Sequence, residues 1–143
     1  YLFRLDAHCI LSKEWDARMK SSCKDHTLVV PVLDAIEQET WTLKHKDACL
    51  IILDKTMRNA FPVIYKSIEE RKLEEETMSI IGQAYMVTKD YYFQSGGCDE
   101  SLGRWGASGL EWSLKTWLTG GRVIVRTDVV CGHLFRENGK TPF

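Results

Sequence analysis

The chain has 143 residues, of which 44% are hydrophobic and 27% charged, and its net charge is −1. This length allows one domain with its own hydrophobic core, and 10 glycines and 3 prolines are too few for a collagen-like, linker-like or disordered chain. The balanced charge argues against nucleic acid as a partner, because proteins that bind DNA or RNA concentrate Lys and Arg.

The N-terminal segment predicts a strand followed by a helix. Residues 1–5 are aromatic and apolar with one charged interruption, a pattern typical of a buried strand. Trp15 and Met19 lie four residues apart, which predicts a short surface helix over residues 13–22 with Ser12 as its N-cap.

The next part of the chain predicts mainly strands. Residues 27–33 are apolar and β-branched. Pro31 cannot donate a hydrogen bond to a neighbouring strand, so we expect this strand to lie at an edge of the sheet or to end there. Two further strands are predicted at residues 39–43 and 48–53, followed by a loop at 55–62.

A charged stretch separates these strands from the next predicted elements. Residues 64–76 are rich in Glu, Lys and Arg, which indicates a solvated helix or a loop without chemistry. Residues 80–87 predict a strand with Gly82 inside it, and an interior glycine often marks the close approach of a ligand or of another backbone. Residues 89–95 predict a short helix that the following Gly96 and Gly97 terminate.

The C-terminal part contains the clearest helix. Residues 108–119 place four large apolar side chains on one helical face, and two glycines follow; the four are Leu110, Leu114, Trp117 and Leu118. Residues 122–130 alternate charged residues with Val and Ile and predict a strand. Strands interleaved with helices indicate a single α/β domain.

No segment is long and apolar enough to span a membrane. The longest apolar run, 48–53, is far shorter than the roughly 20 residues that a bilayer requires. Polar residues interrupt the N-terminus where a signal peptide needs an apolar core. The absence of a signal peptide, together with free cysteines, favours a cytoplasmic location. The five cysteines are odd in number and include no CxxC pair, so we expect mostly buried thiols: Cys9, Cys23, Cys49, Cys98 and Cys131.

Polar residues that could bind a metal follow two predicted strands. Asp6 and His8 come directly after the first strand, and His133 follows the last one. Ligand sites of α/β sheets gather beyond the carboxyl ends of strands, so these side chains are expected in one crevice, where they would suit a divalent ion such as Mn²⁺. The alternative is that both histidines are ordinary hydrogen-bonded residues.

Sequence motifs extend this interpretation over the whole chain. The run 3–9, FRLDAHC, resembles the DXD- or DXH-type motif of GT-A glycosyltransferases, in particular the polypeptide N-acetylgalactosaminyltransferases and their bacterial and viral relatives. Residues 96–100, 105–111 and 117–121 are similar to that family's GG-x-DE, WG-xx-x-LE and W-xx-GG segments. Residues 131–136, CGHLFR, are similar to its GH-[VIL]-FR motif.

The resemblance implies a fold, an activity and a set of ligands. The fold would be the C-terminal portion of a GT-A (nucleotide-diphospho-sugar transferase) fold, α/β with a mixed sheet flanked by helices. The activity would be metal-dependent transfer of a sugar from a nucleotide-sugar donor, such as a UDP-sugar, to a carbohydrate or protein acceptor. Asp6, His8 and His133 would hold Mn²⁺ against the diphosphate, and Arg136 would contact a phosphate, unless it is only a surface arginine.

The resemblance also assigns residues to the substrates. Glu111 would line the crevice for donor sugar and acceptor, the alternative being a simple ion pair with the residue four positions on. Trp105 would stack on a sugar ring or lie in the core. Asp99 and Glu100 would bind the acceptor or be turn residues, and Gly82 would lie against a ligand.

One motif departs from the family's pattern. Where the galactosaminyl enzymes have Glu-Asn, this chain has Ser108 and Gly109, neither of which can act as a general base. Inverting relatives place a catalytic carboxylate in this neighbourhood, so the departure favours a retaining enzyme or a loss of activity.

Only five residues precede Asp6, so most of the nucleotide-binding half of a GT-A fold is missing from the sequence. We therefore expect residues 1–143 to be one domain or a fragment, the metal- and acceptor-binding half of a catalytic domain. Two alternatives remain. The first is a non-catalytic carbohydrate- or protein-binding remnant of the fold. The second is a structural metal module built from His8, Cys9, Cys131 and His133.

Overall fold

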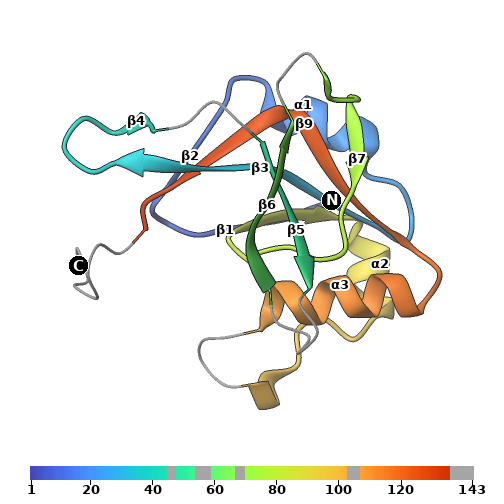
Figure 1. Cartoon of the computed structure of the whole chain (residues 1–143). Coiled ribbons are helices and arrows are strands. Elements are labelled where there is room, and N and C mark those ends of the chain that lie inside the picture. Colours follow the sequence, from blue (N-terminus) through green and yellow to red (C-terminus); the bar gives the residue numbers. More distant parts are fainter. Residues whose placement is uncertain (45–47, 54–58, 67–69, 103–106, 136–143) are drawn as a thin grey trace.

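A mixed β-sheet forms the centre of the molecule (Figure 1). The computed structural model describes residues 1–44, 48–53, 59–66, 70–102 and 107–135. The main path of the sheet follows the order β1 (Leu2–Leu5), β8 (Ala84–Val87), β3 (Thr27–Glu37), β9 (Arg122–His133) and β2 (Cys9–Leu11). β3 and β9 are parallel, whereas β1 with β8, β8 with β3 and β9 with β2 are antiparallel.

Four shorter or separate strands complete the β-structure. β4 (Thr42–Leu43) pairs with β3, and β7 (Glu74–Glu76) pairs with β9. β5 (Ala48–Leu53) and β6 (Asn59–Lys66) form their own antiparallel pair.

Helices cover both faces of the sheet and create two hydrophobic cores. α1 (Trp15–Ser22) contributes Met19 to a core with Val29 of β3. α2 (Lys89–Gln94) and α3 (Ser108–Leu118) contribute Tyr91 and Trp112 to the other core, which includes Leu28 of β3. Successive residues of β3 thus enter opposite cores, as the alternation of side chains along a strand requires. Figure 1 shows α1 and α3 at opposite ends of the view with the sheet between them.

The expected class, α/β with a mixed sheet flanked by helices, is confirmed for the described part of the chain. The helices predicted over 13–22, 89–95 and 108–119 correspond to α1, α2 and α3. None of the described helices is both long and apolar enough to cross a membrane.

The prediction that Pro31 marks an edge or an end of its strand is wrong. β3 continues to Glu37 and lies between β8 and β9. β8 pairs with β3 at Val29, before the proline is reached. On the side of β3 that faces β9, Pro31 pairs with Arg126, whereas the next residue of β3 pairs with Val130. The register therefore shifts directly after Pro31. This bulge lets a proline occupy a central strand.

Two expectations for the middle of the chain are also wrong. The predicted loop at 55–62 overlaps β6, which begins at Asn59. The predicted helix or loop at 64–76 overlaps the end of β6 and contains β7, and its described part includes no α-helix, although Glu70 is in a 3₁₀ conformation. Three successive glutamates form β7 because their backbone pairs with β9, and because Glu74 accepts a hydrogen bond from Ser22 Oγ at 2.6 Å.

Smaller corrections concern the ends and faces of elements. Glu14, in the left-handed conformation, is the N-cap of α1 instead of Ser12, whose Oγ accepts a hydrogen bond from Val130 N–H. The predicted strand 39–43 shrinks to β4, and Gly82 precedes β8 rather than lying inside it.

α3 buries a different face from the one expected. Its buried residues are Gly109, Trp112, Ser113 and Thr116, whereas Leu118 is 84% exposed. Small residues on this face let the helix backbone approach the segment before β8, as the 3.0 Å bond from Ile80 N–H to Ser113 Oγ shows.

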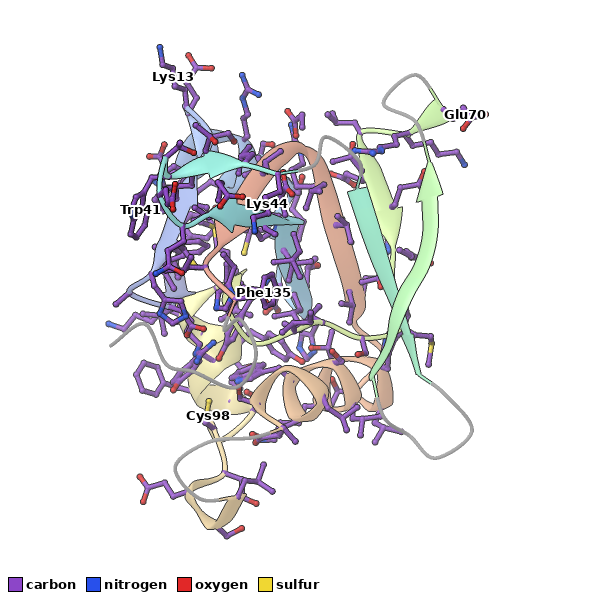
Figure 2. The ribbon with its side chains drawn as sticks, turned by 60° about the vertical axis from the view of Figure 1, so that its left-hand side comes forward. Lys13, Trp41, Lys44, Glu70, Cys98 and Phe135 are labelled. Carbon is purple, nitrogen blue, oxygen red and sulfur yellow. The ribbon has the colours of Figure 1, made fainter. Side chains whose placement is uncertain are left out.

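The expectation of mostly buried thiols is only partly confirmed. Cys23 and Cys131 are buried, Cys9 is half-buried and Cys98 is exposed. Figure 2 labels Cys98 near the junction between α2 and the segment that leads to α3. Its sulfur accepts a hydrogen bond from Trp112 Nε1 at 3.2 Å.

Candidate metal centre

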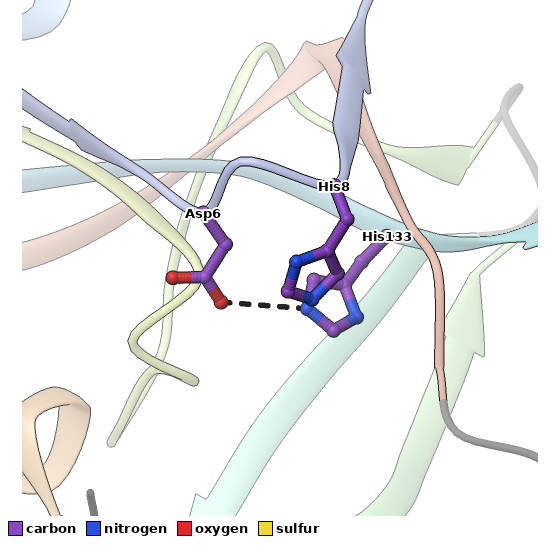
Figure 3. Close-up of side chains that lie close together, drawn as sticks. All are labelled: Asp6, His8 and His133. Carbon is purple, nitrogen blue, oxygen red and sulfur yellow. Dashed lines mark ion pairs between the residues drawn. The ribbon is translucent and has the colours of Figure 1, made fainter. Parts of the chain in front are cut away.

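Three elements bring Asp6, His8 and His133 together (Figure 3). Asp6 follows β1, His8 precedes β2, and His133 is the last residue of β9. β2 pairs with β9 so that Cys9 lies opposite His133, and the carbonyl oxygen of His8 accepts a hydrogen bond from Leu134 N–H at 3.1 Å. The strand pairing therefore holds the two imidazoles side by side, with their ring centroids 4.5 Å apart.

The three side chains form a compact set of ligand atoms. One carboxylate oxygen of Asp6 and one ring nitrogen of each histidine all lie within 4.8 Å of one another. Asp6 Oδ2 is 3.4 Å from His133 Nε2, the contact drawn in Figure 3. This confirms the expectation that these residues meet at one place.

Neighbouring groups hold Asp6 in position. Its backbone N–H donates to the carbonyl oxygen of Gln83 at 2.8 Å. Arg4 Nη2 lies 3.0 Å from Asp6 Oδ1, so the carboxylate joins Arg4 through one oxygen and faces His133 with the other. Residues around metal ligands commonly orient them in this way.

The environment of His133 favours its neutral form. Burial lowers the pKa of His133, the adjacent His8 lowers it further, and Asp6 opposes both effects. A neutral imidazole can bind a metal ion, whereas an imidazolium cannot. His133 Nδ1 is buried without a hydrogen-bond partner among the described residues. A carboxylate oxygen with two imidazole nitrogens fits a divalent cation such as Mn²⁺ or Zn²⁺.

The geometry does not bring cysteines into this group. Among the residues that the structure describes, Asp6, His8 and His133 are the one set of three or more potential ligands that lie close enough to share an ion. The expected alternative of a module with Cys9 and Cys131 as ligands is therefore not supported.

Arg4 lies between the metal group, which consists of Asp6, His8 and His133, and the start of α3. Arg4 Nη1 lies 3.2 Å from the point that a Cβ on Gly82 would occupy, and the backbone N of Gly109 lies at the same distance from that point. The Arg4 guanidinium is also 6.0 Å from the ring centroid of Tyr85. The close approach of another backbone at Gly82 is thus confirmed, and its contact with a ligand stays a prediction.

Glu111 belongs to a second polar cluster at the start of α3. Its Oε1 lies 2.6 Å from Lys115 Nζ and accepts a hydrogen bond from Asp99 N–H at 2.9 Å. Lys115 Nζ also donates to the carbonyl oxygen of Gly97 at 2.7 Å. Glu111 Oε2 is buried without a partner among the described residues. The ion pair expected from the spacing forms, and Glu111 also holds the segment between α2 and α3.

Asp99 and Glu100 lie at the surface in the structure. Asp99 Oδ1 accepts a hydrogen bond from Ser101 N–H at 2.9 Å, and the hydrogen bonds from Ser101 lower the pKa of Asp99. Glu100 begins the 3₁₀-helix η2 (Glu100–Leu102) and is exposed. These are features of turn residues, and their role toward an acceptor stays a prediction. Trp105 and Arg136 lie outside the described residues.

Sequence reasoning overlooked Arg4 and Gln83, the two residues that position Asp6. Arg4 left a signal, because it is the single charged residue of an apolar strand and lies two residues before Asp6, on the same side of an extended chain. Gln83 acts through its backbone carbonyl oxygen and left no signal in the sequence.

Comparisons with known proteins identify one group of relatives. No protein-family model matches the chain. Polypeptide N-acetylgalactosaminyltransferase 13 of Rattus norvegicus is 29% identical over 149 residues, which cover 97% of this chain and 26% of that protein. N-acetylgalactosaminyltransferase 7 of Mus musculus is 26% identical over 160 residues, which cover 96% of this chain and 23% of that protein. The chain thus spans about a quarter of the length of these relatives.

A solved structure extends the match to the fold. The crystal structure of GalNAc-T7 with UDP, GalNAc and Mn²⁺ superposes with a TM-score of 0.80 at 22% identity, covering 99% of this chain and 29% of that one. The chain is therefore a distant homologue of the polypeptide N-acetylgalactosaminyltransferases.

Proposed function

We propose that this chain is the metal- and acceptor-binding part of a GT-A glycosyltransferase. The enzyme would transfer a sugar from a nucleotide-sugar donor, most simply a UDP-sugar, to a carbohydrate or protein acceptor. The observation that carries the proposal is the convergence of Asp6, His8 and His133 within 4.8 Å. The similar fold of GalNAc-T7, whose crystal contains UDP, GalNAc and Mn²⁺, supports the choice of donor and ion.

A divalent cation held by these residues would stabilise, as a Lewis acid, the negative charge that develops on the diphosphate leaving group. The protein's own contribution is to prepare the ligands. Burial lowers the pKa of His133, which favours the unprotonated imidazole. Arg4 holds one oxygen of Asp6 and leaves the other directed toward His133. This arrangement fixes the ligands before an ion binds, so less ordering is needed on binding.

The polar cluster of Glu111 would shape the substrate side of the site. Glu111 is 11% exposed and holds the backbone of Asp99, while Lys115 holds that of Gly97. In the proposed enzyme, Glu111 lies beside the donor sugar and acceptor, and Arg136 contacts the diphosphate. Trp105, Gly82, Asp99 and Glu100 contribute to substrate binding.

The start of α3 supports retention of configuration at the transferred sugar. An inverting mechanism needs a carboxylate base, and Ser108 and Gly109 provide none. A Cβ at position 109 would lie 2.3 Å from the carbonyl oxygen of Ile80, so the packing leaves no room for a side chain there.

The same observation favours a second candidate, a binding domain that kept the fold and lost the activity. Position 109 cannot accommodate the asparagine that the galactosaminyl enzymes carry. Such a domain would bind a carbohydrate or protein whether or not a metal ion is present.

Turnover of UDP-sugars by the full-length protein distinguishes the two candidates. A glycosyltransferase releases UDP in the presence of Mn²⁺ and loses this activity with EDTA and in the variants Asp6→Ala and His133→Ala. His26→Asn, a change at a histidine outside the metal group, should keep full activity. Absence of turnover, together with carbohydrate binding that EDTA does not change, would reject the enzyme and support the binding domain.

A further inference from the structure

Gln83 lies on the same face of the sheet as the metal ligand Asp6. β1 and β8 pair with Arg4 opposite Tyr85, and the hydrogen bond from Asp6 N–H to the carbonyl oxygen of Gln83 extends this pairing by two residues. Opposite residues of an antiparallel pair share a face, as do residues two apart on a strand. The 3.0 Å contact of Arg4 with Asp6 and the 6.0 Å from the Arg4 guanidinium to the Tyr85 ring centroid agree with this face. Because Tyr85 belongs to the core under α3, the Gln83 side chain enters the layer between the sheet and that helix.

A small recess, which we name the Gln83 recess, opens beside this side chain. Its volume is about 260 Å³, including the part that is open to solvent. Aliphatic side chains of β3, of β9 and of the segment before β8 form most of its wall: Val30, Pro31, Leu33, Ile80, Ile81 and Val125. Thr77, Ser79 and Gln83 supply the polar part of the wall. Thr77 Oγ1 already donates a hydrogen bond to the carbonyl oxygen of Ser79 at 3.1 Å.

The amide oxygen of Gln83 determines which ligand chemistry fits this recess. Gln83 is 5% exposed, and its Oε1 is buried without a hydrogen-bond partner among the described residues. A buried acceptor without a partner costs free energy, and a ligand that donates a hydrogen bond to it recovers this cost. An anion or a bare carbonyl group does not, because its lone pairs would face those of Oε1. The aliphatic wall also disfavours a charged ligand.

We propose that the Gln83 recess binds an uncharged group that carries one O–H or N–H donor on a small aliphatic body, and that this donor forms a hydrogen bond to Gln83 Oε1. A hydroxyl group and a secondary amide share this chemistry. The recess lies beside the metal group, because the backbone of Gln83 is bonded to that of Asp6. In the proposed enzyme the bound group therefore belongs to the sugar or to the acceptor, and substrates that lack the donor are rejected. This last step rests on the proposed function, whereas binding to the recess does not.

Two matched pairs of small molecules test the binding without a metal ion or a nucleotide. 2-Propanol and acetone share a carbon skeleton, and N-methylacetamide and methyl acetate share a shape, but only the first member of each pair donates a hydrogen bond. Nuclear magnetic resonance titrations follow the methyl signals of Val30, Ile80 and Val125, which line the recess. We expect saturable shifts, and a Kd about three- to tenfold lower for the donor in at least one pair, which is the contribution of one hydrogen bond. The pair that shows the difference tells whether the recess takes a hydroxyl group or an amide.

The variant Gln83→Met tests whether the difference comes from Oε1. Methionine is similar to glutamine in length and volume, and the backbone carbonyl that accepts from Asp6 N–H remains. Both members of each pair should therefore bind this variant with equal Kd values. Gln94→Met makes the same change at an exposed glutamine of α2 and should discriminate like the wild type. The comparison within each pair needs no variant, so it decides the question even if Gln83→Met does not fold.

Three results for the wild type would overturn the proposal. Equal Kd values within both pairs would show that Gln83 Oε1 does not select the ligand. Tighter binding of acetone or methyl acetate than of the matched donor would show that Gln83 presents its amide nitrogen to the recess. The absence of saturable shifts would leave an ordered water as the occupant. The titrations involve no turnover, so failure of the recess and failure of the proposed glycosyltransferase activity are distinguishable.

Discussion

The variant Gly109→Ala tests the tightest backbone contact beside the candidate site. A Cβ at this position would lie 2.3 Å from the carbonyl oxygen of Ile80 and 2.7 Å from the backbone N of Gly82. A comfortable contact between carbon and oxygen is about 3.3 Å, so α3 or the segment before β8 must move by about 1 Å. The movement also strains the hydrogen bond from Ile80 N–H to Ser113 Oγ.

These terms predict a clear loss of stability. Overpacking costs about 1–3 kcal/mol, and strain in one buried hydrogen bond adds about 1 kcal/mol. The helix propensity of alanine offsets up to about 1 kcal/mol. We expect the free energy of unfolding to fall by about 1–3 kcal/mol, which lowers Tm by roughly 3–10 °C in a domain of this size.

Thermal and urea unfolding followed by circular dichroism measures this change. Ser108→Ala is the matched control, because it alters the neighbouring residue of the same helical turn without meeting backbone atoms. The control should stay close to the wild type. Refutation would come from a Gly109→Ala variant as stable as the wild type or more stable, since the helix would then not be packed against Ile80 as described.

Two further predictions concern the cluster at the start of α3 and the thiols. Glu111→Ala removes the ion pair with Lys115 and the hydrogen bond from Asp99 N–H. We expect the free energy of unfolding to fall by about 1–3 kcal/mol and hydrogen exchange at Asp99 N–H to accelerate. Unchanged exchange at Asp99 N–H would contradict this role of Glu111. Cys98 is exposed, whereas burial raises the pKa of Cys23 to about 11, so iodoacetamide at pH 8 should alkylate Cys98 in the native protein and Cys23 only after unfolding. Equal alkylation rates of the two thiols would show that Cys23 is not buried.

Local patterns in the sequence predicted the helices and the metal group. α2 begins where Thr88 accepts a hydrogen bond from Tyr91 N–H, and it ends before Gly96 and Gly97, both of which have positive φ. Asp6 and His133 could be placed together because each lies at the end of an apolar strand, and the carboxyl ends of strands that run in the same direction lie at one edge of a sheet, even though β8 and β3 separate β1 from β9.

The features that sequence reasoning missed depend on contacts between distant parts of the chain. β7 looks like a solvated segment, yet its pairing with β9 and the 2.7 Å ion pair between Glu76 and Arg122 make it a strand. Pro31 is tolerated in a central strand because β8 pairs with β3 before the proline, at Val29, and because a bulge in β9 shifts the register directly after it. The buried face of α3 is set by small residues that fit against the segment before β8, and apolar periodicity does not report this.

Binding of Mn²⁺ to the reduced protein tests the central claim most directly. Electron paramagnetic resonance should show one bound ion in the wild type and in His26→Asn, and at least about tenfold weaker binding in both Asp6→Ala and His133→Ala. Wild-type affinity in the latter two variants, or no binding to the folded wild type, would contradict a metal centre formed by Asp6, His8 and His133.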